Sequence, residues 1–400
     1  MKKVEGGVCA PKGFVAGAAK AGIKYQDKYD VAIIASEVDA ALAGVFTTNK
    51  IQAAPVVYSK QVSASKTARG VVVNSGNANA CTAEQGMTDC TRMAEMAADI
   101  LGVDASKVAV ASTGVIGVAM PIKKVLEGIR VAGECLTSEG GEQAALALMT
   151  TDTYAKQVAV EISLQGKPVR IGGVCKGSGM IHPNMATMLG FITTDAVIDK
   201  VLLQQFLQEA VAESFNMITV DGDTSTNDMV LIMANGLAGN SPLEATDEAL
   251  QLFKAALNFV CRELAQLIAR DGEGATKFLE VEVAGANTLE AARKGARGIV
   301  ASSLVKAAFY GEDANWGRII CALGYSGADF EPASVDIYLG NLAVAKAGRG
   351  LEFSEAEAKQ ILGQKDIKIR VDLNQGQYQA TAWGCDLSHE YVTINGDYRT

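Results

Sequence analysis

Short runs rich in β-branched residues alternate with segments of helical periodicity along the whole chain, and this alternation most limits the possible folds. Such alternation is typical of a layered α/β or α+β architecture. The 400 residues are enough for about two or three folding units, and 49% are hydrophobic, which can fill sizeable cores. Neither a repeat nor a low-complexity linker marks a boundary, so the sequence predicts no sharp domain border.

The expected elements follow from periodicity and from turn residues. The expected strands are 31–34, 55–58, 70–73, 108–111, 187–192, 367–373 and 378–383, with a hairpin over 157–175 around a Gly166 turn. The expected helices are 82–101, one opened by Pro121, 198–215, 243–270, and one capped by Ser354 and Glu357. For the first helix, Thr82 and Gln85 have the spacing of a capping box.

The charge balance argues against polyanionic partners. The chain has 36 Lys and Arg against 45 Asp and Glu, a formal net charge of −9. A protein of this charge has no general attraction to nucleic acid or anionic lipid, so we expect neither as a partner. No secretory apolar segment follows the first lysines, and no apolar run reaches about 18 residues, so we expect a cytoplasmic protein.

Cysteine and histidine usage argues against disulfides and metals. The eight cysteines are scattered singly through apolar stretches, without a Cys-x-x-Cys pair, which predicts reduced and mostly buried thiols. His182 and His389 are the only histidines. A histidine-rich metal cluster is therefore excluded, and we expect neither a metal nor a cofactor.

The most unusual segment runs from Lys176 to Gly190. Its glycines allow close backbone approach and Pro183 stiffens the chain, so it could hold a strained peptide bond. Taken alone, it also fits an ordinary glycine loop that feeds a strand, with Thr187 as a β-former. A P-loop fails because Lys176 precedes the glycines, and no Gly-x-Ser-x-Gly elbow is present. His182 then suits a structural hydrogen bond better than catalysis.

A catalytic hydroxyl that is not paired with a histidine needs another group to accept its proton. An N-terminal threonine has one in its own α-amino group, whose pKa is about 7.7–8.0. Creating that group inside a chain requires cleavage just before the threonine. At this point the segment 176–191 resembles the bifunctional ornithine acetyltransferase / N-acetylglutamate synthase family of arginine biosynthesis, the ArgJ family, whose members cleave themselves.

The resemblance extends over the whole length in the family's order. The further matching blocks are 10–14, 112–117, 150–153, 271–277, 315–318 and 395–400. One departure is Ala314, where the family pattern leads us to expect proline before Asn-Trp-Gly-Arg.

The resemblance implies the fold and the processing. The fold would be α/β (α+β), a layered αββα sandwich of the DmpA/ArgJ-like kind, formed by two chains. Cleavage between Ala186 and Thr187 would give an α chain, 1–186, and a β chain, 187–400. The α chain would carry the oxyanion hole and part of the substrate pocket, and the β chain the nucleophile and the rest. Two copies of each would form a heterotetramer.

The resemblance also implies the activity. Thr187 would take the acetyl group from N²-acetyl-L-ornithine and pass it to L-glutamate through an acetyl-Thr187 intermediate, a ping-pong reaction. Some members of the family also use acetyl-CoA as donor, and the sequence leaves open whether this chain does. The alternative is an N-terminal-nucleophile aminopeptidase or amidohydrolase of similar fold, in which water is the acceptor.

The family pattern assigns the site residues. The oxyanion hole would be Thr113 and Gly114, where an ordinary strand-to-loop turn is the alternative. The substrate pocket would be lined by Thr153, Lys176, Thr187, Glu273, Asn395 and Thr400, which brings the C-terminus into the site. Lys176 could pair with a carboxylate and Glu273 with the ornithine ammonium. Without the resemblance, each charged member of this set would be assigned to the solvated surface.

The acidic segment 221–228 superficially suggests a calcium loop. It lacks the glycine at position six, where Thr226 stands, and has Ile232 in place of the glutamate at position twelve. We therefore expect a polar turn whose side chains bond nearby backbone and which could support the site.

Overall fold

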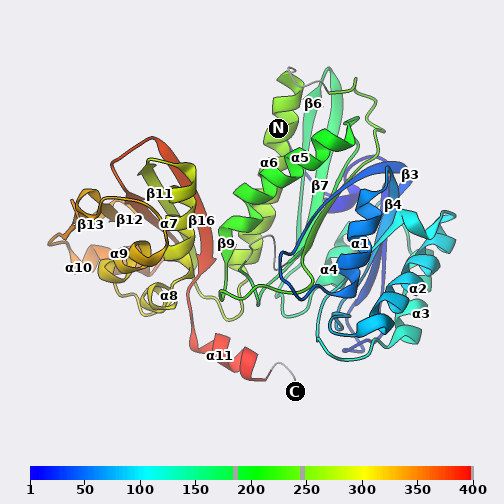
Figure 1. The fold of residues 1–400 in the computed structure, drawn as a ribbon, viewed down its shortest axis with the longest axis horizontal. Helices are drawn as coiled ribbons and strands as arrows, with labels where there is room; N and C mark the ends of the chain where they lie inside the picture. The colour runs from blue at the N-terminus through cyan, green and yellow to red at the C-terminus, as the bar shows by residue number, and fades with distance from the viewer. Residues whose placement is uncertain (183–187, 244–247, 398–400) are drawn as a thin grey trace. The chain divides into compact units, whose positions relative to one another are not determined.

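The computed structural model describes residues 1–182, 188–243 and 248–397 of the chain. Two compact units emerge (Figure 1). Unit 1 comprises Met1–Gly177, Pro183–Asn216 and Asp223–Ile268, and unit 2 comprises Ser178–His182, Met217–Gly222 and Ala269–Thr400. The chain therefore passes between the units several times, which explains why no linker is visible in the sequence.

Unit 1 is built on a nine-stranded sheet with the order β1-β6-β7-β8-β10-β3-β4-β5, with β2 also paired to β3. Its strands are β1 (Lys2–Val4), β2 (Phe14–Ala19), β3 (Val31–Phe46), β4 (Ala68–Asn74), β5 (Val108–Ser112), β6 (Lys156–Leu164), β7 (Lys167–Lys176), β8 (Leu189–Thr194) and β10 (Met229–Ala234). Its helices are α1 (Ala54–Ala64), α2 (Ala83–Leu101), α3 (Ile122–Glu134), α4 (Gly141–Leu148), α5 (Lys200–Glu213) and α6 (Glu248–Arg270), of which the last two residues belong to unit 2.

The long strand β3 turns this sheet into two layers. Its first part, Val31–Ser36, pairs with β2, whereas Ala41–Phe46 pairs with β10. Between the two parts the register with β4 shifts, between Ala35 and Ala40, and residues 37–39 there are exposed. Such an irregularity bends a strand and lets it continue from one layer to the next.

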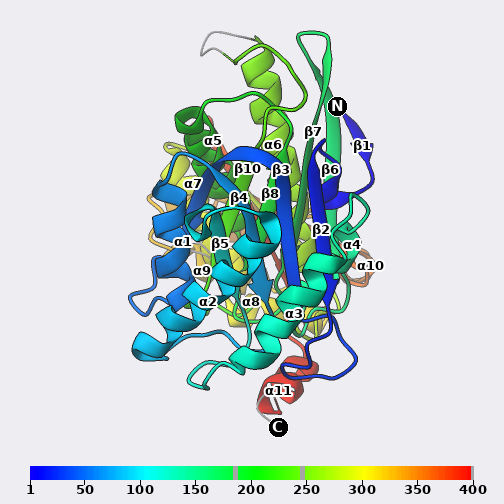
Figure 2. The same cartoon turned by 90° about the vertical axis from the view of Figure 1, so that its right-hand side faces the viewer.

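Helices cover both outer faces of the two layers. Figure 1 shows α5 and α6 on one side of the strands and α1, α2 and α3 on the other, and Figure 2 shows α2 and α3 lying across the strands. One buried core lies between the layers and includes Phe14, Ile34, Val73, Phe191 and Leu231. A second core lies under α2 and α3. The predicted α/β sandwich is thus confirmed.

Unit 2 contains a seven-stranded sheet with the order β14-β13-β12-β15-β11-β16-β9. Its strands are β9 (Ile218–Thr219), β11 (Phe278–Ala286), β12 (Asp336–Leu339), β13 (Leu342–Lys346), β14 (Arg349–Gly350), β15 (Asp366–Asp372) and β16 (Tyr378–Cys385). Its helices are α7 (Leu289–Ala301), α8 (Ser303–Tyr310), α9 (Trp316–Tyr325), α10 (Glu355–Leu362) and α11 (His389–Gly396). α7 packs on the sheet, with Ala292, Ala296 and Ile299 fully buried.

Two local predictions were wrong. The run 55–58 belongs to helix α1, because Pro55 occupies the first turn and Val56 and Val62 bury their side chains in the core of unit 1. The capping box at α2 does not form, since the Thr82 hydroxyl donates to Asn79 Oδ1 at 2.8 Å and Gln85 bonds Asp89 instead.

Most other expected elements are present. The hairpin of β6 and β7 turns at Gln165 and Gly166, which both have positive φ, and Ser354 caps α10 by accepting from the Glu357 N–H. Five of the eight cysteines are buried, which confirms mostly buried thiols, whereas Cys81, Cys135 and Cys321 are exposed. Among the described helices, none is both long and apolar enough to cross a bilayer.

Candidate active site

The predicted nucleophile and scissile bond, Thr187 and Ala186, lie outside the described residues, as does Thr400. The described chain stops at His182 before the predicted nucleophile and resumes at Met188 after it. Lys176 ends strand β7, and Leu189 begins β8, which pairs with β7 through Lys176↔Leu189. The segment 177–188 is therefore a connection between two neighbouring antiparallel strands of unit 1.

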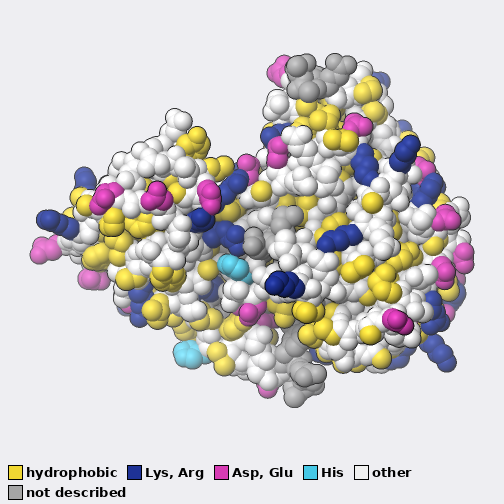
Figure 3. All heavy atoms as spheres, in the orientation of Figure 1, with side chains coloured by type: hydrophobic (Ala, Val, Ile, Leu, Met, Phe, Trp, Pro, Cys, Tyr) yellow, Lys and Arg dark blue, Asp and Glu magenta, His cyan; other side chains and the backbone are white. Residues whose placement is uncertain are grey.

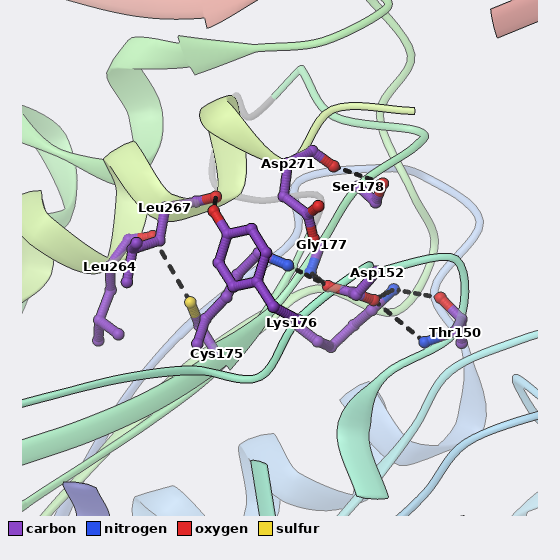
Figure 4. A network of polar contacts seen from close by, with 11 residues as sticks. Thr150, Asp152, Cys175, Lys176, Gly177, Ser178, Leu264, Leu267 and Asp271 are labelled. Atoms are coloured by element: carbon purple, nitrogen blue, oxygen red, sulfur yellow. Dashed lines mark hydrogen bonds and ion pairs between the residues drawn. The ribbon is translucent and has the colours of Figure 1, made fainter. Parts of the chain in front are cut away.

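Lys176 is buried and held by polar partners, contrary to the surface position that its residue type alone suggests. Its side chain is 10% exposed, and Nζ lies 2.8 Å from Thr150 Oγ1 and 3.9 Å from Asp152 Oδ2 (Figure 4). The Asp152 carboxylate also accepts from the Gly177 N–H at 2.7 Å and the Thr150 N–H at 3.0 Å. Asp152 thus fixes both Lys176 and the start of the 177–188 connection.

A second lysine completes this cluster. Lys156 Nζ lies 2.7 Å from Asp152 Oδ1, and both side chains are completely buried. Burial alone would raise the pKa of Asp152, but Lys176 and Lys156 outweigh it and lower the pKa from 3.8 to about 2. Because one carboxylate faces two lysines, the cluster keeps an excess positive charge beside Lys176. Such a charge can hold a substrate carboxylate.

Thr113 and Gly114 form a tight turn directly after β5. Gly114 has φ +132°, and a Cβ at this position would lie 2.3 Å from the carbonyl carbon of Gly76, so only glycine fits. The Thr113 N–H donates to the Asn74 carbonyl at 3.0 Å. Neither the Gly114 N–H nor the Thr113 hydroxyl bonds any described residue. The assignment of these two groups to an oxyanion hole stays a prediction.

The buried side chains of Asn74 and Asn227 fix this turn through hydrogen bonds to neighbouring residues. Ser112 Oγ donates to Asn74 Oδ1 at 2.7 Å, and Asn74 Nδ2 donates to the Asn77 carbonyl at 2.9 Å. Asn227, from the acidic segment, donates through Nδ2 to the carbonyls of Ser112 at 2.8 Å and Ala78 at 2.6 Å. Asn227 therefore holds this turn through bonds to distant backbone, whereas we expected the side chains of 221–228 to bond nearby backbone.

Glu273 and Asn395 meet in unit 2. Glu273 is 6% exposed, and its Oε2 accepts from Asn395 Nδ2 at 2.7 Å. Asn395 lies on α11, whose start approaches Gly274 so closely that a Cβ there would lie 2.6 Å from the Tyr391 nitrogen. The C-terminal helix α11 therefore contacts Glu273 within unit 2, whereas Thr400 lies outside the described residues.

The segment Ser178–His182 also packs against Glu273. The Glu273 N–H donates to the Ser178 carbonyl at 3.1 Å, and a Cβ on Gly179 would lie 2.3 Å from the Glu273 carboxyl carbon. Ser178 Oγ donates to the Asp271 carbonyl at 2.6 Å (Figure 4). Gly179 of the unusual segment is thus needed for close backbone approach to a buried carboxylate.

The predicted site residues fall into both units. Unit 1 contains Thr113, Gly114, exposed Thr153 and Lys176, and unit 2 contains Glu273 and Asn395. Sequence reasoning missed Lys156 and Asn227 and gave Asp152 no role. An Asp four residues before a lysine that opens a strand was the one available signal for the buried pair. Nothing local indicated that Asn227 would reach Ser112.

The order of these motifs suggests a relationship with known proteins, and comparison bears this out. The ArgJ family model matches residues 15–400. The chain belongs to the ArgJ family. The sequence-based resemblance is therefore confirmed for this ArgJ-family chain.

Relatives match the ArgJ-family chain from end to end. It is 55% identical to "Arginine biosynthesis bifunctional protein ArgJ" of Symbiobacterium thermophilum over 402 residues, covering 100% of both chains. The protein of that name from Caldanaerobacter subterraneus is 50% identical, again with 100% coverage of both. A solved chain, arginine biosynthesis bifunctional protein argJ of Bacillus halodurans, is 51% identical with a TM-score of 0.52. The match covers 52% of this chain and 99% of that one.

Among the described residues, no group of three or more His, Cys, Asp or Glu side chains is arranged to hold a metal ion. The described groups offer polar and acid–base chemistry. It comprises two unengaged hydrogen-bond donors after β5, a buried lysine in a cationic cluster, and a buried carboxylate paired with an amide.

Proposed function

We propose that this protein is a glutamate N-acetyltransferase of arginine biosynthesis that moves an acetyl group from N²-acetyl-L-ornithine to L-glutamate. The observation that carries this proposal is the match of the ArgJ family model to residues 15–400. The relatives that match over their full length are named for arginine biosynthesis, and the substrates are small molecules.

The nucleophile in this proposal is produced by the chain itself. The Thr187 hydroxyl attacks the Ala186 carbonyl carbon, the peptide C–N bond breaks, and an ester forms that water then hydrolyses. The products are chains 1–186 and 187–400, and the second begins with a free α-amino group beside its hydroxyl. The length of the solved Bacillus halodurans chain supports this proposal, since it corresponds to about half of the present chain.

Acetyl transfer then proceeds in two steps. The Thr187 amino group accepts the hydroxyl proton while the oxygen attacks the acetyl carbonyl, and ornithine leaves with that proton. The amine of glutamate attacks the acetyl ester, which releases N-acetylglutamate and restores Thr187. Both steps pass through an oxyanion, for which the Gly114 N–H and the Thr113 hydroxyl are suitable donors.

Lys176 and Glu273 give the pocket charges of opposite sign. In this proposal Lys176, kept cationic in the Asp152 cluster, binds the substrate α-carboxylate. Glu273 binds the ornithine ammonium, and Asn395 positions the Glu273 carboxylate through the 2.7 Å hydrogen bond. Thr153 and Thr400 complete the pocket. In this proposal the enzyme acts in the cytoplasm as two α and two β chains, without a cofactor.

The test is intact-mass spectrometry of the purified protein after mixing with N²-acetyl-L-ornithine. We expect two fragments, of about 19 and about 22 kDa, from 41.7 kDa scaled by 186/400 and 214/400. The larger fragment should gain one acetyl group, about 42 Da, and its sequence should begin at Thr187. A single uncleaved chain in fully active material would disprove the mechanism, as would acetylation of the smaller fragment alone.

Glutamate distinguishes transfer from hydrolysis. An acetyltransferase should form N-acetylglutamate in proportion to the ornithine released. An N-terminal-nucleophile hydrolase would release acetate at a rate that glutamate does not change. As a control, Thr187→Ala removes the attacking oxygen and should abolish both cleavage and transfer, whereas Thr187→Ser should retain part of each.

A further inference from the structure

One serine joins the two segments of unit 2 that carry Glu273 and Asn395. Glu273 lies in the loop 271–277 between α6 and β11, which we call the Glu273 loop, and Asn395 lies on α11. Ser388 is 6% exposed and caps α11, because its Oγ accepts from the Tyr391 N–H at 3.4 Å. The same hydroxyl donates to the Gly274 carbonyl at 2.6 Å. Ser388 therefore bonds both the Glu273 loop and the helix that carries Asn395.

The Glu273 loop and the start of α11 are in close contact at this serine. Gly274 has φ +67°, in the left-handed region that favours glycine. A Cβ on Gly274 would lie 2.6 Å from the Tyr391 nitrogen and 2.9 Å from Ser388 Oγ. The loop itself is closed by the Ala275 N–H, which donates to the Gly272 carbonyl at 2.8 Å. The Ser388 hydroxyl therefore bonds the loop where its backbone and that of α11 already lie side by side.

A buried carboxylate holds the other end of the same loop. Asp386 is 2% exposed, and its Oδ1 accepts from the N–H groups of Thr276 at 2.8 Å and Lys277 at 2.9 Å. Its Oδ2 accepts from the Thr276 hydroxyl, and the Asp386 N–H donates to the Lys277 carbonyl at 3.2 Å. Hydrogen bonds to an ionised acceptor are stronger than those between neutral groups. Asp386 and Ser388, two residues apart, thus hold the Glu273 loop at two points.

The end of β16, from which these two residues follow, is anchored by a buried lysine of α8. Lys306 is 2% exposed, and its Nζ donates to the Cys385 carbonyl and lies 3.5 Å from Cys385 Sγ. The Leu387 N–H donates to the Lys306 carbonyl at 3.3 Å. Cys385 in turn packs on the Glu273 loop, because a Cβ on Gly272 would lie 2.6 Å from its Sγ. Residues 385–388 are therefore held by α8 and contact the Glu273 loop.

The position of the Glu273 carboxylate is what this support determines. Its Oε2 accepts from Asn395 Nδ2 at 2.7 Å. On the face of unit 2 that Figure 3 shows, the described acidic side chains (magenta) are interspersed with basic ones (dark blue) and form no continuous acidic area. Recognition of an ammonium group then depends on where a single carboxylate lies. A displacement of about 1 Å can already reduce the rate strongly.

We propose that Ser388 is a positioning residue that sets the preference of the enzyme for a donor with a terminal ammonium group. The inference rests on the proposed function, in which Glu273 binds the ornithine ammonium. Ser388 acts through Glu273 and not through contact with the substrate. It holds the Glu273 loop against the first turn of α11, so that the Glu273 carboxylate stays paired with Asn395. Without the hydroxyl, the Gly274 carbonyl loses its donor and α11 loses its cap.

The test compares two acetyl donors, with glutamate as acceptor and the full, processed protein as enzyme. N²-acetyl-L-norvaline has the carbon chain of N²-acetyl-L-ornithine but lacks the terminal ammonium. The wild type should prefer acetylornithine by about a hundredfold or more in kcat/KM. Ser388→Ala should reduce this preference about tenfold, mainly by raising KM for acetylornithine, and should leave kcat/KM for acetylnorvaline within about twofold. An equal loss with both donors, or an unchanged preference, would overturn the proposal.

Ser354→Ala is the matched control, because Ser354 is also a helix-capping serine of unit 2. Its Oγ accepts from the Glu357 N–H at 3.2 Å at the start of α10, and in the described part of the chain it bonds no residue of the Glu273 loop. Both alanine variants remove a cap and should lower the unfolding temperature by similar amounts. Only Ser388→Ala should change the donor preference. A change of similar size in Ser354→Ala would contradict the proposal.

A conservative variant supplies the second check. Ser388→Thr keeps a hydroxyl that can cap α11 and bond the Gly274 carbonyl, so it should recover much of the donor preference. A folded Ser388→Thr variant with a preference as low as that of Ser388→Ala would show that the hydroxyl is not the cause.

A double-mutant cycle with Glu273 separates this inference from the proposed function. Glu273→Gln removes the charge and should abolish the preference for acetylornithine, so that adding Ser388→Ala changes it no further. Loss of the preference in Glu273→Gln, with a wild-type preference in Ser388→Ala, would refute the role of Ser388 and leave the proposed function intact. A wild-type protein that transfers acetyl from neither donor would refute the proposed function and, with it, this inference.

Discussion

Asn395 Nδ2 lies 2.7 Å from Glu273 Oε2, although 122 residues separate them in the sequence. Glu273 is buried, whereas Asn395 lies on the exposed surface of the C-terminal helix α11. The hydrogen bond therefore ties the end of the chain to a buried carboxylate. In the proposed reaction this bond orients the group that recognises the ornithine ammonium.

Removal of the Asn395 amide should impair substrate recognition. Asn395→Ala should lower kcat/KM for N²-acetyl-L-ornithine about tenfold or more, mainly through KM, because a hydrogen bond to a charged group is worth about 1.5–3 kcal/mol. Steady-state kinetics measure this effect. Val392→Ala, on the same helix and exposed, should leave KM unchanged. An equal change in both variants would indicate a general effect of α11.

The turn after β5 should tolerate no side chain at Gly114. Gly114→Ala places a Cβ against Gly76 and should shift the proposed oxyanion donor, which lowers kcat about 10²–10³-fold. Gly117→Ala is the matched control, since Gly117 also has positive φ, +71°, but a Cβ there meets nothing within 4 Å. That control should cost about 1 kcal/mol of stability and retain kcat. Similar kcat values in both variants would remove Gly114 from the oxyanion hole.

Asn227 should act as a positioning residue for the same turn. Asn227→Ala leaves the Ser112 and Ala78 carbonyls without their donor, so kcat should fall about tenfold while KM changes little. Asn235, at the opposite end of β10, likewise donates to a backbone carbonyl, that of Lys12. Asn235→Ala should lower the unfolding temperature by a similar amount without reducing kcat. Loss of kcat in Asn235→Ala alone would contradict this assignment.

The Asp152 carboxylate should stabilise unit 1 strongly. Asp152→Asn leaves Lys156 buried without a counter-charge and should reduce the free energy of unfolding by about 3–5 kcal/mol. Denaturant unfolding measures the loss. The double variant Asp152→Asn with Lys156→Met removes both charges and should recover much of the stability. A double variant no more stable than Asp152→Asn would show that the charge imbalance is not the cause.

The same carboxylate makes stability depend on pH in acid. Its pKa is about 2 in the folded protein against the ordinary aspartate value of 3.8, so its contribution is fully present above pH 3.8 and is lost as pH falls through 2. The difference of nearly two pH units corresponds to about 2 kcal/mol. The difference in the free energy of unfolding between wild type and Asp152→Asn should therefore become smaller from pH 4 to pH 2. A constant gap would contradict the lowered pKa.

Local patterns predicted elements well where periodicity and turn chemistry agreed. The β6–β7 hairpin formed at Gly166, because two positive-φ residues can close it without tertiary help. The pattern failed at 55–58, because the two consecutive valines suggest a strand although the segment lies in helix α1. The capping-box prediction also failed, because the Thr82 hydroxyl donates to Asn79 Oδ1 and does not cap the helix.

Local sequence patterns also did not predict how the chain divides into two compact units. The compact units exchange short segments, such as Ser178–His182 and Met217–Gly222, so no composition change marks the crossings. The predicted chains 1–186 and 187–400 describe a covalent cut, which differs from these compact units. That cut stays a prediction, because it depends on chemistry at residues outside those described.

The sequence by itself determined the family, the layered α/β class and the residue types of the site, because ordered motifs and periodicity are properties of the chain. Only the tertiary structure decided that Lys156 shares Asp152 with Lys176, that Asn227 supports the Thr113 turn and that Asn395 reaches Glu273. These contacts join residues on different elements. Their energies depend on burial and geometry, which are created when strands and helices pack together and which no local pattern contains.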